Sequence, residues 1–445
     1  DLHGNATRLE ALAKQAATHG ATLGLSTELA ICGYPPRDLL LQPDFVVKAQ
    51  SKASTLSVSI PVLVGAPLAP DHPKQLPSNG VVRCGPLSSA PPNGTRIVAR
   101  KQLLPTYDVF DEARYFKPDN RPGIARTIAG LDLGVTVCED AWQAADMTPS
   151  AYAADPIESL AEWGRQGVEL DATVNLSASP YHSDKLASRI HVCRTAASIL
   201  NHPFLMANQV GGNDDLLFDG NSLVAWPDGT VVIAPAWKEG VLMVHLDDAN
   251  ACEWLPSTAD DALDVGDDQL RRLQPDDDGR EHEREVLHDL ADAVVTGLTD
   301  YCRKSGIKSI VLGLSGGIDS AVAACVAAAA VGPENVTGIA MPSRHSSQHS
   351  IDDAAHTAAS LGLKFDTIPI DSMHASVEGS IGGMLEQGAQ VAGENLQARL
   401  RGLIVMAHAN AQGSMAIATG NKSELAQGYC TLYGDMAGGY TPLGD

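Results

Sequence analysis

Short apolar runs alternate with helical patterns along most of the chain, and this alternation limits the possible folds more than any other feature. VLVG at 62–65, LGVTVC at 133–138 and ATVNLS at 172–177 are runs of the length and apolarity that form buried strands. Amphipathic helix patterns lie between or before such runs, for example at 5–19 and 184–201. Strands that alternate with helices predict a layered α/β fold.

Two stretches interrupt the alternation. Residues 218–246 contain SLVAW, TVVIA and VLMVHL joined by PDG and KEG, which predicts an antiparallel meander at the end of the first region. Residues 251–285 are acidic and poor in apolar residues, which predicts a solvated linker, with an acidic helical face as the alternative. We therefore expect one domain at 1–250 and a second, doubly wound parallel α/β domain at 286–445.

The net charge argues against a nucleic acid partner. The chain has 54 acidic and 31 basic residues, so its formal charge is −23 and it would repel a polyphosphate. Any nucleotide site must therefore be local. Aromatic residues make up only 4% of the chain, which leaves few platforms on which bases could stack.

Neither a membrane span nor a disulfide framework is predicted. The sequence contains no run of about 18 apolar residues, the minimum for a spanning helix. The eight cysteines are scattered without a CxxC motif, a pattern typical of reduced thiols in the cytoplasm. We expect a cytoplasmic protein.

The sharpest local motif is SGGIDS at 315–320, between the apolar strand at 310–314 and the alanine-rich helix that follows. A glycine-rich turn at this position lets backbone N–H groups and a helix N-terminus converge on an anion. It is not a Walker A loop, because the GxxxxGK[ST] pattern and its lysine are missing. Such a loop suits a pyrophosphate leaving group, and Asp319 would bind Mg²⁺ through its carboxylate.

This loop resembles that of the pyrophosphate-releasing ATPases, which activate a carboxylate or amide as an adenylate. ENLQARLRG at 394–402 and ATGNKSELAQGYCTLYGDMAGG at 418–439 resemble the NAD⁺ synthetase family specifically. The resemblance implies that deamido-NAD⁺ meets Asn395, Glu424 and Arg399, and that Mg²⁺ meets Asp319 and Glu424. The residues it places around ATP are Gly313, Leu314, Ser315, Gly316, Gly317, Ile318, Asp319, Ser320 and Thr419.

A second constellation lies in the first half of the chain. Glu28 in STELAICGY, Lys101 in RKQLLPTYDVF and Cys138 in GVTVCEDAW occur in the order and local settings of a Glu–Lys–Cys triad, and they resemble that of the nitrilase, or carbon–nitrogen hydrolase, superfamily. In this chemistry a thiolate attacks an amide carbon, a carboxylate moves the proton, and an ammonium stabilises the oxyanion. The resemblance implies an α-β-β-α sandwich and places further residues around glutamine: Tyr107, Glu112, Ser179 and Lys185.

One competing motif is a pair of histidines. His345 and His349 are four residues apart and would share one helix face, as in zinc proteases. The glutamate that follows the first histidine in those enzymes is Ser346 here, and no third ligand is evident. We do not assign a metal to this pair.

Taken together, the chain resembles the glutamine-dependent NAD⁺ synthetase family over nearly its whole length. The resemblance implies that glutamine, ATP with Mg²⁺ and deamido-NAD⁺ are consumed without a tightly bound organic cofactor, and that the enzyme is a homo-oligomer. The chain starts at Asp1 and ends at Asp445 in a glycine-rich run, so we expect both ends to continue in a longer protein that supplies the family's C-terminal lysine. Two alternatives remain: another amidotransferase of the same ATPase type, and a non-catalytic nucleotide-sensing module.

Overall fold

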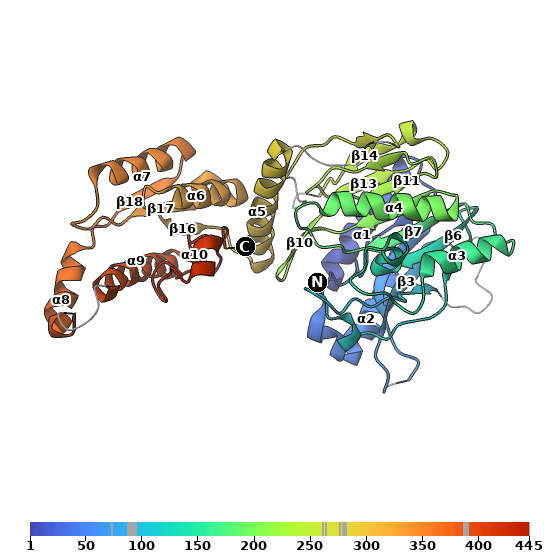
Figure 1. Cartoon of the computed structure of the whole chain (residues 1–445), viewed down its shortest axis with the longest axis horizontal. Helices are drawn as coiled ribbons and strands as arrows, with labels where there is room; N and C mark the ends of the chain where they lie inside the picture. Colours follow the sequence, from blue (N-terminus) through green and yellow to red (C-terminus); the bar gives the residue numbers. More distant parts are fainter. Residues whose placement is uncertain are drawn as a thin grey trace. The chain divides into compact units, whose positions relative to one another are not determined.

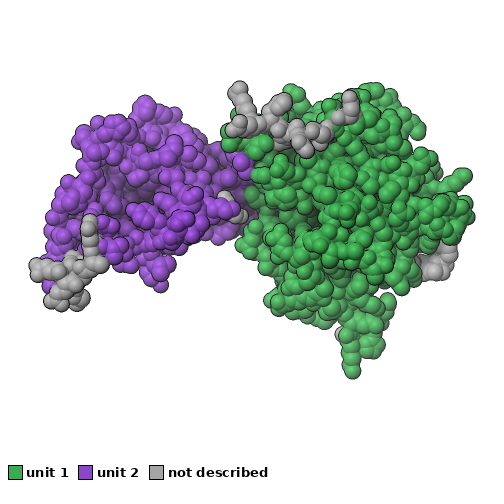
Figure 2. Space-filling model, viewed as in Figure 1, with its two compact units in different colours: residues 1–289 green, residues 290–445 purple. Residues whose placement is uncertain are grey.

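The computed structural model describes residues 1–444 except 73, 87–95, 260–261, 263–264, 276, 278–282 and 386–390. The chain divides into two compact units, residues 1–289 and residues 290–445 (Figure 2). Each unit has its own sheets and its own apolar core, and each is described separately below. None of the described helices is long and apolar enough to cross a bilayer.

Unit 1 is built on two sheets. The first has the order β1-β2-β3-β4, and the second has the order β15-β12-β11-β8-β7-β6-β5. The bounds in the first sheet are β1 (Gly24–Leu25), β2 (Val62–Leu68), β3 (Ser78–Cys84) and β4 (Ile97–Arg100). Those in the second are β5 (Gly123–Ile128), β6 (Leu131–Val137), β7 (Ala172–Ser177), β8 (Phe204–Asn208), β11 (Leu223–Ala225), β12 (Val231–Ile233) and β15 (Arg271–Leu273).

Three apolar layers hold these sheets and their helices together. Helices α1 (Leu2–Thr18) and α2 (Pro43–Ser54) pack on the first sheet through small residues such as Ala13 and Ala49. Between the two sheets, Leu63 and Val81 meet a cluster that includes Val135. On the outer face of the second sheet lie α3 (Pro156–Arg165) and α4 (Lys185–Leu200). The expected α-β-β-α sandwich is confirmed.

The end of unit 1 differs from the predicted meander. β11 and β12 pair as an antiparallel hairpin, but the third segment, β13 (Gly240–Met243), pairs with β14 (Glu253–Pro256) in a separate two-stranded sheet. β12 pairs instead with β15, so both β14 and β15 come from the segment 251–285 that the sequence predicts as a linker. A two-stranded ribbon, β9 (Val210–Asn213) with β10 (Leu216–Asp219), also precedes the hairpin. Backbone pairing thus draws part of an acidic segment into unit 1.

Unit 2 is a parallel sheet with helices on both faces. Its strands are β16 (Ile310–Gly313), β17 (Val336–Ala340), β18 (Lys364–Thr367) and β19 (Met415–Ala416), in the order β18-β17-β16-β19. One face packs against α6 (Ile318–Val331), α7 (Gln348–Leu361) and the later turns of α5 (Glu283–Ser305), and the other packs against α9 (Val391–Gln412) (Figure 1). The remaining helices are α8 (Asp371–Leu385) and α10 (Lys422–Gln427). The doubly wound prediction for this region is confirmed.

Candidate active sites

The first site is centred on a buried lysine in unit 1. The ammonium Nζ of Lys101 lies 2.7 Å from Oε1 of Glu28 and 2.7 Å from Oε1 of Glu112. The side chains of Lys101 and Glu28 are fully buried, and that of Glu112 is 4% exposed. Burying three charges is costly unless each is compensated, and here one cation serves two anions. Glu28 and Lys101, two predicted site residues that are far apart in the sequence, thus lie in direct contact.

Glu28 is held in place by donors from two other strands. The amide Nδ2 of Asn79, on β3, donates to Oε1 at 2.6 Å, and the backbone N–H of Ala178, just after β7, donates to Oε2 at 3.1 Å. On the other side of the lysine, the hydroxyl of Tyr34 donates to Oε1 of Glu112 at 2.8 Å. These contacts fix which carboxylate oxygens face the ammonium.

Cys138 stands at the turn from β6 into the short helix η3 (Cys138–Ala141), with a φ of 44°. This left-handed conformation is strained for a residue with a side chain, and such strain is often found at reactive positions. Burial raises the pKa of the Cys138 thiol well above its usual value, and the charge of Glu28 raises it further, while Lys101 acts in the opposite direction. The thiol is therefore protonated at rest, and a carboxylate that can receive its proton lies within electrostatic range.

Asp140 connects the lysine and cysteine segments. Its Oδ1 accepts the backbone N–H groups of Gln102 at 2.9 Å and Leu103 at 2.8 Å, and its Oδ2 accepts that of Val137 at 3.0 Å. These are the residues next to Lys101 and Cys138 in sequence. One buried carboxylate thus holds the two chain segments that carry the predicted catalytic residues.

The predicted glutamine-contact residues have different surroundings in unit 1. Tyr107 donates its hydroxyl to Oε1 of Glu139, the residue after Cys138, at 2.8 Å. Ser179 is 2% exposed and its buried hydroxyl has no partner among the described residues. Lys185 begins α4, and its ammonium lies 4.3 Å from the centre of the Trp142 ring. Glu112, the fourth predicted glutamine contact, instead pairs with the buried ammonium of Lys101.

Sequence reasoning missed Tyr34, Asn79, Glu139 and Asp140. The sequence does carry a signal for two of them, because Glu139 and Asp140 are charged residues directly after an apolar strand, in VCEDAW. In the structure both are at least 97% buried. Acidic residues next to a buried strand need specific partners, so this pair could have been predicted to hold part of the site in place. Tyr34 and Asn79 carry no comparable local pattern, since their partners lie 78 and 51 residues away.

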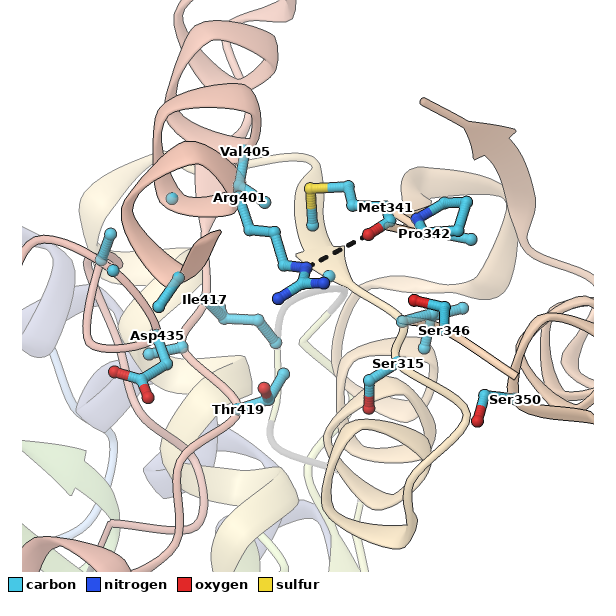
Figure 3. Close-up of a pocket in the computed structure, with 18 of the residues that line it drawn as sticks. Ser315, Met341, Pro342, Ser346, Ser350, Arg401, Val405, Ile417, Thr419 and Asp435 are labelled. Atoms are coloured by element: carbon cyan, nitrogen blue, oxygen red, sulfur yellow. Dashed lines mark hydrogen bonds between the residues drawn. The ribbon is translucent and has the colours of Figure 1, made fainter. Parts of the chain in front are cut away.

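The second site is a cavity of about 370 Å³ in unit 2 (Figure 3). It opens beyond the carboxyl ends of β16, β17 and β19, where doubly wound sheets bind their ligands. Gly313, Leu314, Ser315 and Thr419, all predicted to meet ATP, line it. The rest of its wall is largely apolar, with Met341, Val405 and Ile417 among the residues that contribute.

The remaining loop residues form the entrance to α6. Gly316 has a φ of +82°, and a Cβ there would collide with the backbone oxygen of Ser350, so this position requires glycine. The hydroxyls of Ser315 and Ser320 lie 3.1 Å apart, and the N–H of Gly317 donates to the Ser315 hydroxyl at 3.1 Å. Ile318, the first residue of α6, is 74% exposed. The loop thus has the form of an anion-binding turn at a helix N-terminus.

Asp319 and Glu424, the predicted metal residues, meet at Asn421. The amide of Asn421 donates to Oδ1 of Asp319 at 3.0 Å, and its backbone N–H donates to Oε2 of Glu424 at 3.1 Å. Two half-buried carboxylates beside an anion-binding loop are a hard-oxygen donor set that fits Mg²⁺, which usually takes one or two carboxylates together with phosphate oxygens.

The residues of α9 divide into two groups. Asn395 accepts a hydrogen bond from the Thr431 hydroxyl at 2.9 Å, and Arg399 donates from Nε to the backbone oxygen of Leu432 at 3.2 Å; neither lines the cavity. Arg401, which we did not predict, does line it and donates from Nε to the Met341 oxygen at 3.1 Å (Figure 3). Residues two apart on a helix point to different sides. The spacing in ARLRG therefore could have predicted that only one of the two arginines faces the cavity.

The histidine pair shows no metal site. His349 pairs with Asp353 at 2.8 Å, and His345 is exposed. Within the part of the chain that the structure describes, no group of three or more His, Cys, Asp or Glu side chains could hold a metal ion.

Comparisons with known proteins agree with this division of the chain. Residues 1–254 match the carbon–nitrogen hydrolase family and residues 290–445 match the NAD synthase family. The glutamine-dependent NAD(+) synthetase of Synechocystis sp. is 39% identical over 99% of this chain and 75% of its own, and that of Rhodobacter capsulatus is 40% identical over 100% and 73%. A solved glutamine-dependent NAD⁺ synthetase from Acinetobacter baumannii, in complex with ADP, is 30% identical with a TM-score of 0.79, and covers 100% of this chain and 76% of its own.

Proposed function

Because the chain belongs to the glutamine-dependent NAD⁺ synthetases, we propose that its two sites carry out the two halves of one amidation. Unit 1 releases ammonia from glutamine, and unit 2 uses ATP to transfer that ammonia to the nicotinate carboxylate of deamido-NAD⁺. The observation that carries the proposal is the buried lysine held between two carboxylates beside Cys138. The proposal covers the catalytic residues, the metal and the substrates.

In the glutaminase half, Glu28 accepts the Cys138 proton as the sulfur attacks the amide carbon of glutamine. Lys101 stabilises the oxyanion, because its ammonium is already fixed and shielded from water. The proton then passes to the departing ammonia, which leaves a thioester on Cys138. Glu28 next activates a water molecule that hydrolyses the thioester and releases glutamate.

In the synthetase half, the carboxylate of deamido-NAD⁺ attacks the α-phosphorus of ATP and displaces pyrophosphate. The backbone N–H groups of the 315–320 loop receive the phosphates at the start of α6. Among the described residues that line the cavity, Arg401 is the only lysine or arginine, and it binds the substrate's phosphate oxygens. Ammonia then attacks the acyl carbon of the adenylate and displaces AMP, which yields NAD⁺.

Asp319 and Glu424 would hold the Mg²⁺ that accompanies ATP. When bound, the ion neutralises charge on the phosphate oxygens. Asn421 orients both carboxylates toward this position through its side chain and its backbone.

The test is a reaction with the whole protein supplied with glutamine, ATP, Mg²⁺ and deamido-NAD⁺. We expect equal amounts of NAD⁺, AMP and pyrophosphate, and at least as much glutamate. ATP-dependent pyrophosphate release with another carboxylate, and none with deamido-NAD⁺, would show a different amidotransferase. Glutamate formation without any adenylation would leave unit 2 as a nucleotide-sensing module.

Two further parts of the proposal concern the protein in the cell. All eight cysteines are free thiols, which supports a cytoplasmic location. We propose a homo-oligomer on the basis of the family resemblance alone, and light scattering of the whole protein tests it.

A further inference from the structure

Asn79 is a buried residue of β3 that contacts two members of the lysine cluster at once. It is 1% exposed, and its amide Nδ2 donates to Oε1 of Glu28 at 2.6 Å. Its backbone oxygen accepts the N–H of Lys101 at 2.8 Å. One residue thus holds the side chain of Glu28 and the main chain of Lys101, and the proposed mechanism does not use it.

The two carboxylate oxygens of Glu28 have different surroundings. Oε1 accepts the Lys101 ammonium at 2.7 Å and the Asn79 amide at 2.6 Å, so both of its lone pairs are in use. Among the described residues, Oε2 accepts only the backbone N–H of Ala178, at 3.1 Å. A carboxylate oxygen accepts two donors, so one position on Oε2 is open. A proton that arrives from a thiol can bind there without displacing the ammonium.

The other end of the Asn79 amide indicates that this residue does more than stabilise the fold. Its Oδ1 is buried and has no hydrogen-bond partner in the described parts of the chain. A buried acceptor without a partner is destabilising, and a leucine of nearly the same shape would not bring that cost. The amide cannot be reversed, because Oδ1 would then lie against a carboxylate oxygen that has no hydrogen to donate. The contact that requires asparagine is therefore the donation to Glu28.

We infer that Asn79 is a positioning residue of the glutaminase site: together with Lys101 it occupies Oε1 of Glu28, so that Oε2 takes the Cys138 proton. The S–H bond breaks, an O–H bond forms at Oε2, and the sulfur uses the electron pair to attack the amide carbon. The Lys101 ammonium meanwhile stays at Oε1. This inference rests on the proposed glutaminase function and names the atom at which its base works.

The alternative is that Asn79 only ties β3 to the segment of Glu28. Two substitutions separate these roles. Asn79→Leu has nearly the same shape and removes the donor, so Oε1 gains an open position that competes with Oε2 for the proton. Asn79→Asp also has nearly the same shape, and its carboxyl group can donate to Oε1 while it is protonated but not after it ionises.

Asn221 offers a matched control in the same unit. It is 4% exposed, and its Nδ2 donates at 2.6 Å to Oδ2 of Asp219. The same oxygen accepts the buried guanidinium of Arg189 at 2.8 Å. The Oδ1 of Asn221 is likewise without a partner among the described residues. Asn221→Asp therefore makes the same chemical change beside another buried ion pair.

The experiment follows ammonia release from glutamine in the first turnover, by rapid quench, with the whole protein between about pH 6 and about pH 9. For Asn79→Leu we expect the rate at saturating glutamine to fall by about 10–10²-fold, as for a misplaced catalytic group, and the half-saturating concentration to change by less than about 3-fold. Asn79→Asp should be faster than Asn79→Leu at the acidic end, and this advantage should shrink as the pH rises. Asn221→Asp should follow the wild type throughout.

Three results would overturn the inference. Asn79→Leu could react within about 3-fold of the wild-type rate, which would show that the donor is not needed. Asn79→Asp could be no faster than Asn79→Leu at any pH, which would leave Asn79 as a structural tie. Asn221→Asp could lose as much rate as Asn79→Leu, which would make the loss a general effect of disturbing a buried amide. If the wild type releases no ammonia from glutamine, the proposed function itself fails.

Discussion

The two sites differ in how much of their charge the protein itself compensates. In unit 1, Lys101 is fully buried and already paired with Glu28 and Glu112. In unit 2, the cavity wall is largely apolar, and its polar side chains, such as Ser315 and Arg401, are not buried. Folding thus completes the first reactive centre, whereas the second depends on the charge of its nucleotide and metal. The predictions below test this difference, from the largest expected effect to the smallest.

Loss of the nucleophile should abolish the activity of the first site and leave that of the second site intact. Cys138→Ala removes the sulfur at a cost in stability of about 1–2 kcal/mol, since the cavity left is small. Glutamine-dependent NAD⁺ synthesis should fall by about 10⁴-fold or more, because no thioester can form. Synthesis from ammonium salt should persist and rise with pH as the unprotonated fraction grows.

NAD⁺ formation with each nitrogen source measures this separation, with Cys325→Ala, at an exposed thiol, as the control. If folded Cys138→Ala loses both activities, the two-site interpretation is wrong.

Removal of the central cation should damage both chemistry and stability in unit 1. Lys101→Met leaves two neighbouring buried carboxyl groups, Glu28 and Glu112, without their cation, and breaking such a cluster costs about 3–5 kcal/mol. Thioester formation should be abolished, because the oxyanion loses its cationic partner. Denaturant unfolding and rapid-quench trapping of the thioester measure the two effects.

Lys117→Met, at an exposed lysine of the same unit, should leave both properties unchanged. Normal glutamine turnover in Lys101→Met would remove Lys101 from the catalytic site.

In unit 2, the loss of one metal carboxylate should affect activity without a comparable loss of stability. Asp319→Asn removes a charge and keeps the backbone donors of the loop, so NAD⁺ synthesis should fall by about 10²-fold. Higher Mg²⁺ should restore part of the rate, and basal glutaminase activity should persist. Unchanged NAD⁺ synthesis at saturating Mg²⁺ would exclude Asp319 as a ligand.

A smaller effect should distinguish the two arginines of α9. Arg401→Gln should raise KM for ATP or deamido-NAD⁺ by about 10-fold, since a charge-assisted contact contributes about 1.5–3 kcal/mol. Arg399→Gln should have a weaker effect, because its side chain contacts the Leu432 backbone outside the cavity lining. The opposite order in steady-state kinetics would return the phosphate contact to Arg399.

The smallest effect concerns the pH dependence of stability. Burial raises the pKa of Glu112 to about 7 from its usual value near 4.5, although Lys101 lowers it. Because the folded chain holds this proton more tightly, the stabilisation is present below about pH 4.5 and is lost as the pH rises through about 7. Glu112→Gln should reduce the difference in unfolding free energy between pH 5 and 7.5 by on the order of 1–2 kcal/mol. An unchanged difference in urea titrations would contradict the raised pKa.

The sequence predicts features that depend on contiguous residues, but not those that depend on which distant segments meet. Strand and helix periodicity predicts an α/β layer fold for the first region and a doubly wound unit for the second, whereas the α-β-β-α sandwich is implied only by the family resemblance. The 315–320 loop is recognisable in the sequence because it is a contiguous backbone turn. The pairing of β13 with β14 was not predictable, because a sequence pattern shows that a segment is a strand but not which partner it chooses. The contacts of Tyr34 and Asn79 were missed for a related reason, since they are made only when distant strands meet.

Asp140 has a consequence for how the first site tolerates thermal motion. Lys101 and Cys138 lie on different strand ends, so their independent fluctuations would add and blur the distance between ammonium and sulfur. Both segments hydrogen-bond to the same rigid carboxylate, through Leu103 on one side and Val137 on the other. A displacement of one segment therefore carries the other with it. The absolute positions of the two proposed catalytic groups can vary while their separation, on which the proposed chemistry depends, is conserved.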